Sequence, residues 1–325
     1  MPMRAAEVTE FGGTDGIEVT DTEKPEPGEG QVRIEVRAAG INFADIMQRR
    51  GHYQGGPEPP YVPGMEVAGV IDAVGDGVGR EPGEAVVSLV NGGGYAEYAV
   101  ADARGLLDIP GELSFEEAAG FPVQWLTAHN CLHEWGGLEE GETVLIHAAA
   151  GGVGSAAVQL ADEAGAEIIG TASTDEKLSM AEGLGMDHRI QYTEEDFVER
   201  VNEITTGDGV DLVLDGIGGE TSDESLDALT SFGRMVSFGA AAGEPGRPNT
   251  ADLLFGNQRV IGYHLGRAIQ EKPMKVMGAV PELTQLLGDG TLEVQVGHTF
   301  GLEEAADAHE FIEARKSSGK VVLVP

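Results

Sequence analysis

The strongest chemical signal in this sequence is a glycine-rich loop between a strand-like and a helix-like segment, "TVLIHAAAGGVGSAAVQLADEAGA". Ala149, Gly151 and Gly154 follow an AxGxxG spacing, one alanine away from the dinucleotide-binding fingerprint. Glycine at 151 would let the backbone approach a pyrophosphate, and glycine at 154 would let the helix pack on the strand. An ordinary tight turn is the alternative, but the flanking strand and the anion-attracting helix N-terminus favour nucleotide binding.

The residues after the next predicted strand bear on the choice of cofactor. NAD-specific folds carry an acidic residue about 20 positions further on, where it binds the ribose hydroxyls. This sequence has Ser173 and Thr174 there, followed by Lys177. A 2′-phosphate would not be repelled and the lysine would compensate its charge, so the pattern favours NADPH. The string "STDE" at 173–176 also fits a capping box whose acidic residues complement the helix dipole, and both interpretations can hold.

Other residues were considered as metal or disulfide partners. His129 and His133 are four positions apart on a predicted helix, a spacing that suits a metal ion. No HExxH glutamate and no third ligand accompany them, so we expect packing or surface histidines and no metal site. The lone cysteine, Cys131, excludes an intramolecular disulfide and suits a reducing compartment.

The elements that position these residues form two patterns. Residues 4–122 contain short alternating strands such as "QVRIEVRA", separated by Gly/Pro turns, which indicates a barrel-like β domain. From about residue 143 strands alternate with helices, which indicates a parallel sheet with helical crossovers. The tail returns to the first domain in our interpretation. We therefore predict one domain from residues 1–123 and 266–325, and a nucleotide-binding domain over 124–265.

The charge balance limits the partners. With 56 acidic and 20 basic residues the formal net charge is -36, yet 41% of residues are hydrophobic, so the acid must lie on a folded surface. Such a surface opposes nucleic acid and anionic lipid. It also suits a salt-rich cytoplasm, so we expect a halophilic source. The sequence lacks a signal-peptide core and the roughly 18 continuous apolar residues of a membrane span, and we expect a cytoplasmic protein.

Several strings match a known family in the same order along the chain. They are "AAGINFADIMQRRGHY", "PPYVPGMEVAGVIDAVG", "GGGYAEYAV", "WLTAHNCL", "HAAAGGVGSAAVQLA" and "RMVSFGAAAG". With them the chain resembles the quinone oxidoreductase, or zeta-crystallin-like, group of the medium-chain dehydrogenase/reductase superfamily. The resemblance implies an α/β protein with a GroES-like β-rich catalytic domain and a Rossmann-type, doubly wound parallel sheet. It also implies homodimers that pair edge strands, for which residues 258–265 are the candidate.

The resemblance also bears on metal chemistry. Zinc-dependent members of the superfamily use an early cysteine and a GHE motif, whereas this chain has "NFADIM" and Gly64, Met65, Glu66 at those positions. The cysteine-rich loop of a structural zinc is missing too, so a zinc-free enzyme is implied. A quinone or enone needs no metal, because it accepts hydride at a conjugated position and spreads the charge onto oxygen.

Site residues follow from the resemblance and from the loop together. The implied catalytic residues line the cleft where substrate meets nicotinamide: Asn42, Asp45 and Tyr53, with Tyr53 as candidate proton donor and solvent as the alternative. Each has a structural alternative as a cap or loop residue. Many relatives carry a second tyrosine where this chain has Ile46 and Met47. The expected cofactor-binding residues are Gln124, Thr127, Ala149, Gly151, Gly152, Val153, Gly154, Ser173, Lys177, Tyr192, Phe238, Gly239 and Lys320.

The expected function is an NADPH-dependent quinone oxidoreductase that passes hydride to quinones or other conjugated carbonyls. One alternative is an NADPH-dependent 2-enoyl-thioester reductase, for which similar proteins use a tyrosine at the position of Tyr53 as general acid. An alternative of another class is a non-catalytic, crystallin-like nucleotide-binding protein. The acidic surface argues against an RNA-associated role.

Overall fold

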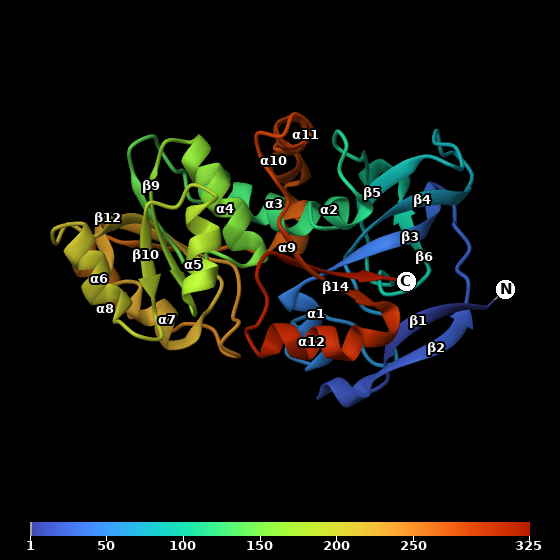
Figure 1. Cartoon of the computed structure of the whole chain (residues 1–325), viewed down its shortest axis with the longest axis horizontal. Helices are drawn as coiled ribbons and strands as arrows, with labels where there is room; N and C mark the ends of the chain where they lie inside the picture. The colour runs from blue at the N-terminus through green and yellow to red at the C-terminus, as the bar shows by residue number, and fades with distance from the viewer. Residues whose placement is uncertain (1) are drawn as a thin grey trace. The chain divides into compact units, whose positions relative to one another are not determined.

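The computed structural model describes residues 2–325 and divides into two compact units (Figure 1). The first contains Met1–Val123 and Thr284–Pro325, and the second contains Gln124–Leu283. Residues 266–283, which we assigned to the first domain, therefore lie in the second unit. There Lys275 Nζ donates to the carbonyl oxygen of Glu134, and Asn130 Nδ2 donates to that of Val276. The division into catalytic and nucleotide-binding domains stays a prediction.

The strands of the first unit pair across long sequence separations. They are β1 (Pro2–Val8), β2 (Ile17–Glu23), β3 (Gln31–Ile41), β4 (Glu66–Val74), β5 (Ala85–Leu89), β6 (Tyr98–Asp102), β7 (Leu106–Asp108), β14 (Val296–Gly301) and β15 (Lys320–Val324). Within residues 2–325 the main sheet has the order β14-β15-β3-β4-β5-β7, with β6 also paired to β3 and with β1-β2 as a separate pair. The period-two pattern predicted for β3 is confirmed by its alternating burial.

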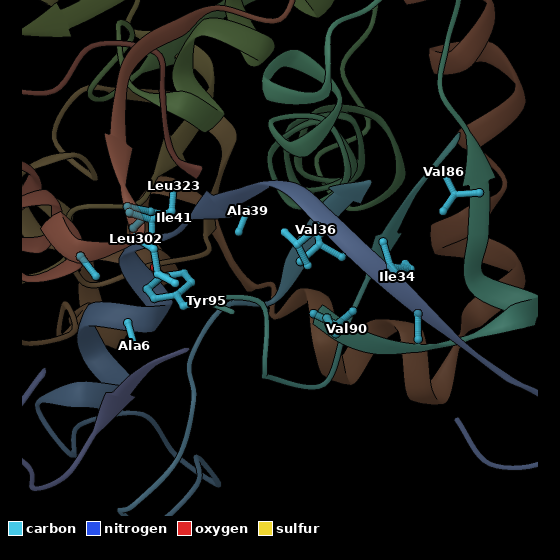
Figure 2. Packing of buried hydrophobic residues seen from close by; sticks show 14 of the residues in the cluster. Ala6, Ile34, Val36, Ala39, Ile41, Val86, Val90, Tyr95, Leu302 and Leu323 are labelled. Atoms are coloured by element: carbon cyan, nitrogen blue, oxygen red, sulfur yellow. The ribbon is translucent and has the colours of Figure 1, made fainter. Parts of the chain in front are cut away.

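The core of the first unit lies on the apolar faces of these strands. Figure 2 shows Ile34 and Val36 of β3 near Val90, and Ile41 near Tyr95 and Leu302. All of these side chains are buried, and each buried aliphatic side chain contributes about 1.5–3 kcal/mol. The first unit also carries the helices α1 (Phe43–Arg49), α2 (Phe115–Ala119) and α12 (Ala305–Glu313).

The second unit contains a fully parallel sheet. Its strands are β8 (Thr143–Ile146), β9 (Glu167–Ala172), β10 (His188–Gln191), β11 (Val210–Asp215), β12 (Leu229–Ser237) and β13 (Arg259–Gly262). Their order among the described residues is β10-β9-β8-β11-β12-β13, and each neighbouring pair is parallel. Counted from β8 this is the doubly wound order 3-2-1-4-5-6, in which ligands bind where the order reverses, between β8 and β11. The predicted Rossmann-type sheet is confirmed.

Helices connect the strands of this sheet, as the alternation in the sequence predicted. The helices beyond residue 121 and before α12 are α3 (Pro122–His129), α4 (Gly152–Glu163), α5 (Asp175–Glu182), α6 (Phe197–Ile204), α7 (Gly219–Glu224), α8 (Thr250–Gly256), α9 (Leu265–Glu271), α10 (Pro273–Met277) and α11 (Val280–Gly288). Among residues 2–325 no helix is long and apolar enough to cross a membrane.

Candidate active site

The glycine loop lies at the switch point of the parallel sheet. It follows β8, and the amide of Ala149 donates to the carbonyl oxygen of Thr171 at 3.0 Å, which ties the loop to β9. A Cβ on Gly154 would overlap the Ala148 carbonyl oxygen and lie 2.8 Å from the Ala149 Cα atom. Only glycine lets α4 approach the strand this closely, as the fingerprint predicted.

The first turn of α4 suits a pyrophosphate. The helix has twelve residues, and its N-cap, Gly151, makes no side-chain cap hydrogen bond. The first backbone N–H groups of the helix therefore have no capping acceptor and point out of its positive end. The side chain of Gln124 lies against Gly152, since a Cβ at that glycine would overlap its amide. The predicted cofactor residues Gln124, Ala149, Gly151, Gly152, Val153 and Gly154 thus gather around one loop.

A buried histidine that sequence reasoning missed supports this loop. His147 lies between Thr171 Oγ1, 3.1 Å from Nδ1, and Ser225 Oγ, 2.8 Å from Nε2. The Ser225 hydroxyl donates to the Thr221 carbonyl oxygen, so it accepts from Nε2–H, and Nδ1 accepts from Thr171. Burial lowers the pKa of His147 to about 4, so the imidazole is neutral. A histidine directly after an apolar strand gave no signal for this role.

The predicted 2′-phosphate residues gather where β9 and β10 end. Because the two strands are parallel, their carboxyl ends share one edge of the sheet. There the Thr193 hydroxyl donates to the Ser173 carbonyl oxygen at 3.1 Å, and the Tyr192 amide donates to the Ala172 carbonyl oxygen at 3.3 Å. Lys177 lies on the first turn of α5. No carboxylate follows β9 directly, as the sequence indicated.

The capping box predicted at 173–176 is wrong in register. The N-cap of α5 is Thr174, whose hydroxyl accepts from the backbone N–H of Lys177 at 3.4 Å. A lysine at the third helical position cannot return a hydrogen bond to the N-cap amide, so the reciprocal box does not form. Asp175 and Glu176 do lie in the first turn, where they complement the helix dipole.

Two further predicted cofactor residues follow β12. The amide of Phe238 donates to the Asp215 carbonyl oxygen at 2.9 Å, and a Cβ on Gly239 would lie 2.7 Å from the Gly216 carbonyl oxygen. The buried Asp215 carboxylate accepts from the backbone amides of Ile217 and Gly218, which fixes the loop after β11. Phe238 and Gly239 therefore lie at the carboxyl edge of the sheet, which is the edge where ligands bind in such folds. Thr127 is buried on α3.

In the first unit, Asn42 is fixed by a buried ion pair. Its Nδ2 donates to Glu66 Oε1 at 2.8 Å, and its Oδ1 accepts from Lys320 Nζ at 2.9 Å. Lys320 and Glu66 also form a direct ion pair, and both are fully buried. Because an ammonium only donates and a carboxylate only accepts, these partners determine which way the Asn42 amide faces.

Sheet register explains why these residues meet. Lys320 begins β15, Asn42 directly follows β3 and Glu66 begins β4, and these three strands are neighbours. Gly40 leaves the space, since a Cβ there would lie 2.6 Å from both Glu66 Oε1 and Lys320 Cε. The burial of Lys320 gives its predicted contact with cofactor phosphates no support, because its ammonium is shielded and occupied. Sequence reasoning missed Glu66, which is far from both partners in the chain.

Asp45 forms a second buried network. Its Oδ2 accepts from the backbone N–H of Asn42 at 2.8 Å and from the Tyr95 hydroxyl at 3.1 Å, and the Tyr95 oxygen lies 3.2 Å from His309 Nε2. The capping role that we weighed for Asn42 and Asp45 is present at the start of α1. Burial raises the pKa of Asp45 to about 6 and lowers that of His309 to about 3.

Tyr53 follows α1 and is partly buried. Its carbonyl oxygen accepts from the Gly56 amide at 3.0 Å, which closes a turn. Burial, and then the nearby Asp45 carboxylate, raise the pKa of the Tyr53 phenol. Of the residues that replace a second tyrosine, Ile46 is fully buried in the core and Met47 is partly buried.

The histidine pair for which we expected no metal lies in the second unit. The rings of His129 and His133 are 4.8 Å apart, and His129 Nε2 is 3.9 Å from the Glu282 carboxylate. Burial lowers the pKa of both histidines. Within residues 2–325 no group of three or more His, Cys, Asp or Glu side chains is arranged to hold a metal ion.

A doubly wound sheet with a glycine loop at its switch point, joined to a β-rich unit, is typical of two-domain, dinucleotide-dependent oxidoreductases. Residues 28–111 match the family described as alcohol dehydrogenase GroES-like domain, and residues 152–282 match that described as zinc-binding dehydrogenase. The expected GroES-like domain is thereby confirmed.

Relatives that match over the whole chain show to which group of these oxidoreductases the protein belongs. The chain is 36% identical to a quinone oxidoreductase of Pseudomonas aeruginosa, with 97% of each chain covered. It is also 36% identical to the human synaptic vesicle membrane protein VAT-1 homolog, over 99% of this chain and 86% of that protein. The crystal structure of Escherichia coli quinone oxidoreductase complexed with NADPH matches with a TM-score of 0.92 at 34% identity, over 99% of this chain and 100% of that one.

The chain therefore belongs to the medium-chain dehydrogenase/reductase superfamily, in its quinone oxidoreductase and VAT-1-like group. The chain is accordingly an NAD(P)H-dependent oxidoreductase of this superfamily.

Proposed function

We propose that this protein is an NADPH-dependent reductase of quinones and related conjugated carbonyls. The observation that carries the proposal is the uncapped first turn of α4 behind a glycine loop, together with Ser173 directly after β9 and Lys177 on the first turn of α5. These residues fit a cofactor with a pyrophosphate and a 2′-phosphate. The NADPH complex of the Escherichia coli relative supports the same cofactor.

The second unit would hold the cofactor, and bound NADPH would supply the hydride. The amides of Gly152, Val153 and Gly154 would bind the pyrophosphate, while Ser173, Lys177 and Tyr192 would bind the 2′-phosphate and adenosine. Phe238, Gly239, Gln124 and Thr127 would contact the nicotinamide half. The neutral His147 keeps the loop in shape beneath these contacts.

The first unit would bind the acceptor. Asn42 Nδ2 carries two hydrogens and one is bonded to Glu66, so the second is available to the acceptor oxygen as negative charge develops there. Lys320 on Oδ1 polarises the amide and makes it a better donor. Asp45 holds the start of α1 and thereby the position of Asn42. Tyr53, or solvent, would return the proton.

A second candidate substrate class is the 2-enoyl thioesters. It is suggested by Tyr53, whose phenol is protonated at neutral pH and would act as the general acid. Burial and the nearby Asp45 carboxylate raise the pKa of this phenol, which makes it a weaker acid. Tyr53→Phe should nearly abolish enoyl-thioester reduction. Quinone reduction should fall only modestly, since a reduced quinone can take its proton from water.

The test is NADPH and NADH oxidation at 340 nm in molar salt with 1,4-benzoquinone, 9,10-phenanthrenequinone, crotonyl-CoA and an aliphatic aldehyde. Quinone-dependent loss of NADPH supports the proposal. Preference for crotonyl-CoA would move the assignment to enoyl reduction. Silence with all four acceptors despite tight NADPH binding would favour the non-catalytic, crystallin-like alternative.

We further propose a cytoplasmic homodimer from a halophilic source. β13 is an edge strand of the parallel sheet, and α8 before it exposes Leu254 and Phe255, which are 71% and 84% accessible. Light scattering in molar salt tests the dimer. Loss of structure at low salt, with recovery on salt addition, tests the halophilic assignment, and indifference to salt contradicts it.

A further inference from the structure

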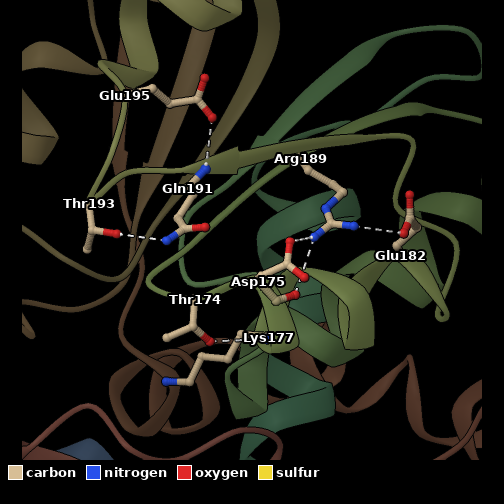
Figure 3. Close-up of polar contacts among 8 residues, drawn as sticks. All are labelled: Thr174, Asp175, Lys177, Glu182, Arg189, Gln191, Thr193 and Glu195. Atoms are coloured by element: carbon tan, nitrogen blue, oxygen red, sulfur yellow. Dashed lines mark hydrogen bonds and ion pairs between the residues drawn. The ribbon is translucent and has the colours of Figure 1, made fainter.

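One arginine neutralises two carboxylates beside the proposed 2′-phosphate site. The Arg189 guanidinium forms an ion pair with the Asp175 carboxylate and a second one with Glu182, at 3.3 Å (Figure 3). It also donates to the Asp175 carbonyl oxygen at 3.3 Å. Asp175 and Glu182 are the first and last residues of α5, so Arg189 spans the whole helix.

The position of Asp175 gives this contact its importance. Asp175 follows the N-cap Thr174 and lies within two positions of Ser173 and Lys177, the residues proposed for the 2′-phosphate. A phosphate monoester carries about -1.5 to -2 charges at pH 7, so an unneutralised carboxylate here would weaken its binding. In Figure 3 the Lys177 side chain points away from the Arg189 pair, and Asp175 points toward it.

We propose that Arg189 is a specificity-determining residue that favours NADPH by neutralising Asp175. Arg189 lies on β10, beside Gly170 of β9, and its guanidinium holds the Asp175 carboxylate on the side away from the Lys177 side chain (Figure 3). The acidic residue at the start of α5 therefore keeps its favourable interaction with the helix dipole without opposing the phosphate. This inference rests on the proposed NADPH preference.

A purely structural role of Arg189 predicts different effects of the variants than charge neutralisation does. If Arg189 only fastened α5 to β10, then Arg189→Gln and Asp175→Asn would both loosen this attachment and weaken NADPH and NADH alike. If Arg189 neutralises Asp175, then Arg189→Gln releases a repulsive carboxylate, whereas Asp175→Asn removes it. The double variant separates the two cases, because rescue occurs only when the carboxylate is the cause.

The experiment measures binding in the full-length protein by nicotinamide fluorescence, for NADPH and NADH, and by competition with adenosine 2′,5′-bisphosphate and AMP. Arg189→Gln should weaken NADPH about fivefold, as expected for one partly screened charge near a phosphate, and leave NADH within about twofold. Asp175→Asn should bind NADPH as well as or better than the wild type. The double variant should return to about the wild-type value.

Arg267→Gln is the matched control. Arg267 lies in the same unit and pairs with Glu271 at 2.9 Å, so its loss changes the net charge equally without touching α5. Equal weakening of NADPH and NADH in Arg189→Gln, no rescue in the double variant, or wild-type affinities that are equal for the two cofactors would each overturn the inference. A lack of quinone reduction contradicts the proposed reaction instead, and it leaves the binding ratios interpretable.

Discussion

Replacing Asp45 with asparagine isolates the energetic effect of a buried carboxylate. The Asp45 side chain is fully buried, and its Oδ2 accepts from the Asn42 amide and the Tyr95 hydroxyl. No group in residues 2–325 bonds to its Oδ1. Asparagine has nearly the same shape and keeps an acceptor for both donors, so the change mainly removes the ability to ionise.

The magnitude follows from the pKa. Burial raises the pKa of Asp45 from 3.8 to about 6, so the folded state binds the proton more tightly than the unfolded chain does. This tighter proton binding contributes fully to the free energy of unfolding at a pH below 3.8, the pKa in the unfolded chain. The contribution is lost as the pH rises through about 6. At about 1.4 kcal/mol for each unit of pKa, the loss approaches about 3 kcal/mol at neutral pH. The free energy of unfolding of Asp45→Asn, relative to that of the wild type, should therefore rise by about 2–3 kcal/mol between pH 4 and pH 7.5.

Hydrogen exchange read by mass spectrometry suits this measurement. Both tryptophans, Trp125 and Trp135, lie in the second unit, so their fluorescence does not follow the unit that contains Asp45. Peptides from β3 and β4 report its opening free energy, and comparing the two proteins at the same pH cancels the intrinsic exchange rate. Any packing effect of asparagine that does not depend on pH shifts the free-energy difference by the same amount at every pH. A difference between the proteins that is flat from pH 4 to 7.5 would refute the reasoning.

Four further changes test other parts of the site. Lys320→Met should destabilise the first unit by about 3–5 kcal/mol in chemical unfolding, because it strands a buried carboxylate, and adding Glu66→Gln should recover most of the loss. Gly154→Ala should reduce NADPH affinity at least about tenfold in fluorescence titration, since its Cβ would overlap the loop that binds the pyrophosphate. The pKa of His147 is lowered from 6.5 to about 4, so the free energy of unfolding of the second unit should fall by up to about 3 kcal/mol as the pH drops through this range. In His147→Gln this fall should be smaller, as measured by tryptophan fluorescence. Lys177→Glu should raise the KM for NADPH far more than that for NADH, and equal effects would contradict its phosphate role.

How much the sequence could predict depended on the range of the interactions. The glycine loop and the alternation of strands and helices are local patterns, and they yielded the parallel sheet and its ligand edge. The N-cap of α5 was misplaced by one residue because Ser173 and Thr174 are equally good caps, and only the end of β9 decides between them. The ion pair of Glu66 and Lys320 joins residues separated by 254 positions, so strand register had to be known first. The partners of His147 lie 24 and 78 positions away, so it was missed for the same reason. The partners of Arg189 are 7 and 14 positions away, but only the folded arrangement of β10 and α5 brings them together.

The few cations of this chain explain how an acidic protein can build a phosphate site. Among 20 lysines and arginines, Lys320 is buried against Glu66, Arg234 is bonded to Glu142, and Arg189 neutralises both ends of α5. Burial of Lys320 and Arg234 limits the screening that salt provides, whereas Arg189 meets Asp175 and Glu182 at the surface. In our proposal, phosphate binding at α4 and α5 would depend on local neutralisation by Arg189 and on backbone amides, and not on the overall charge of the protein.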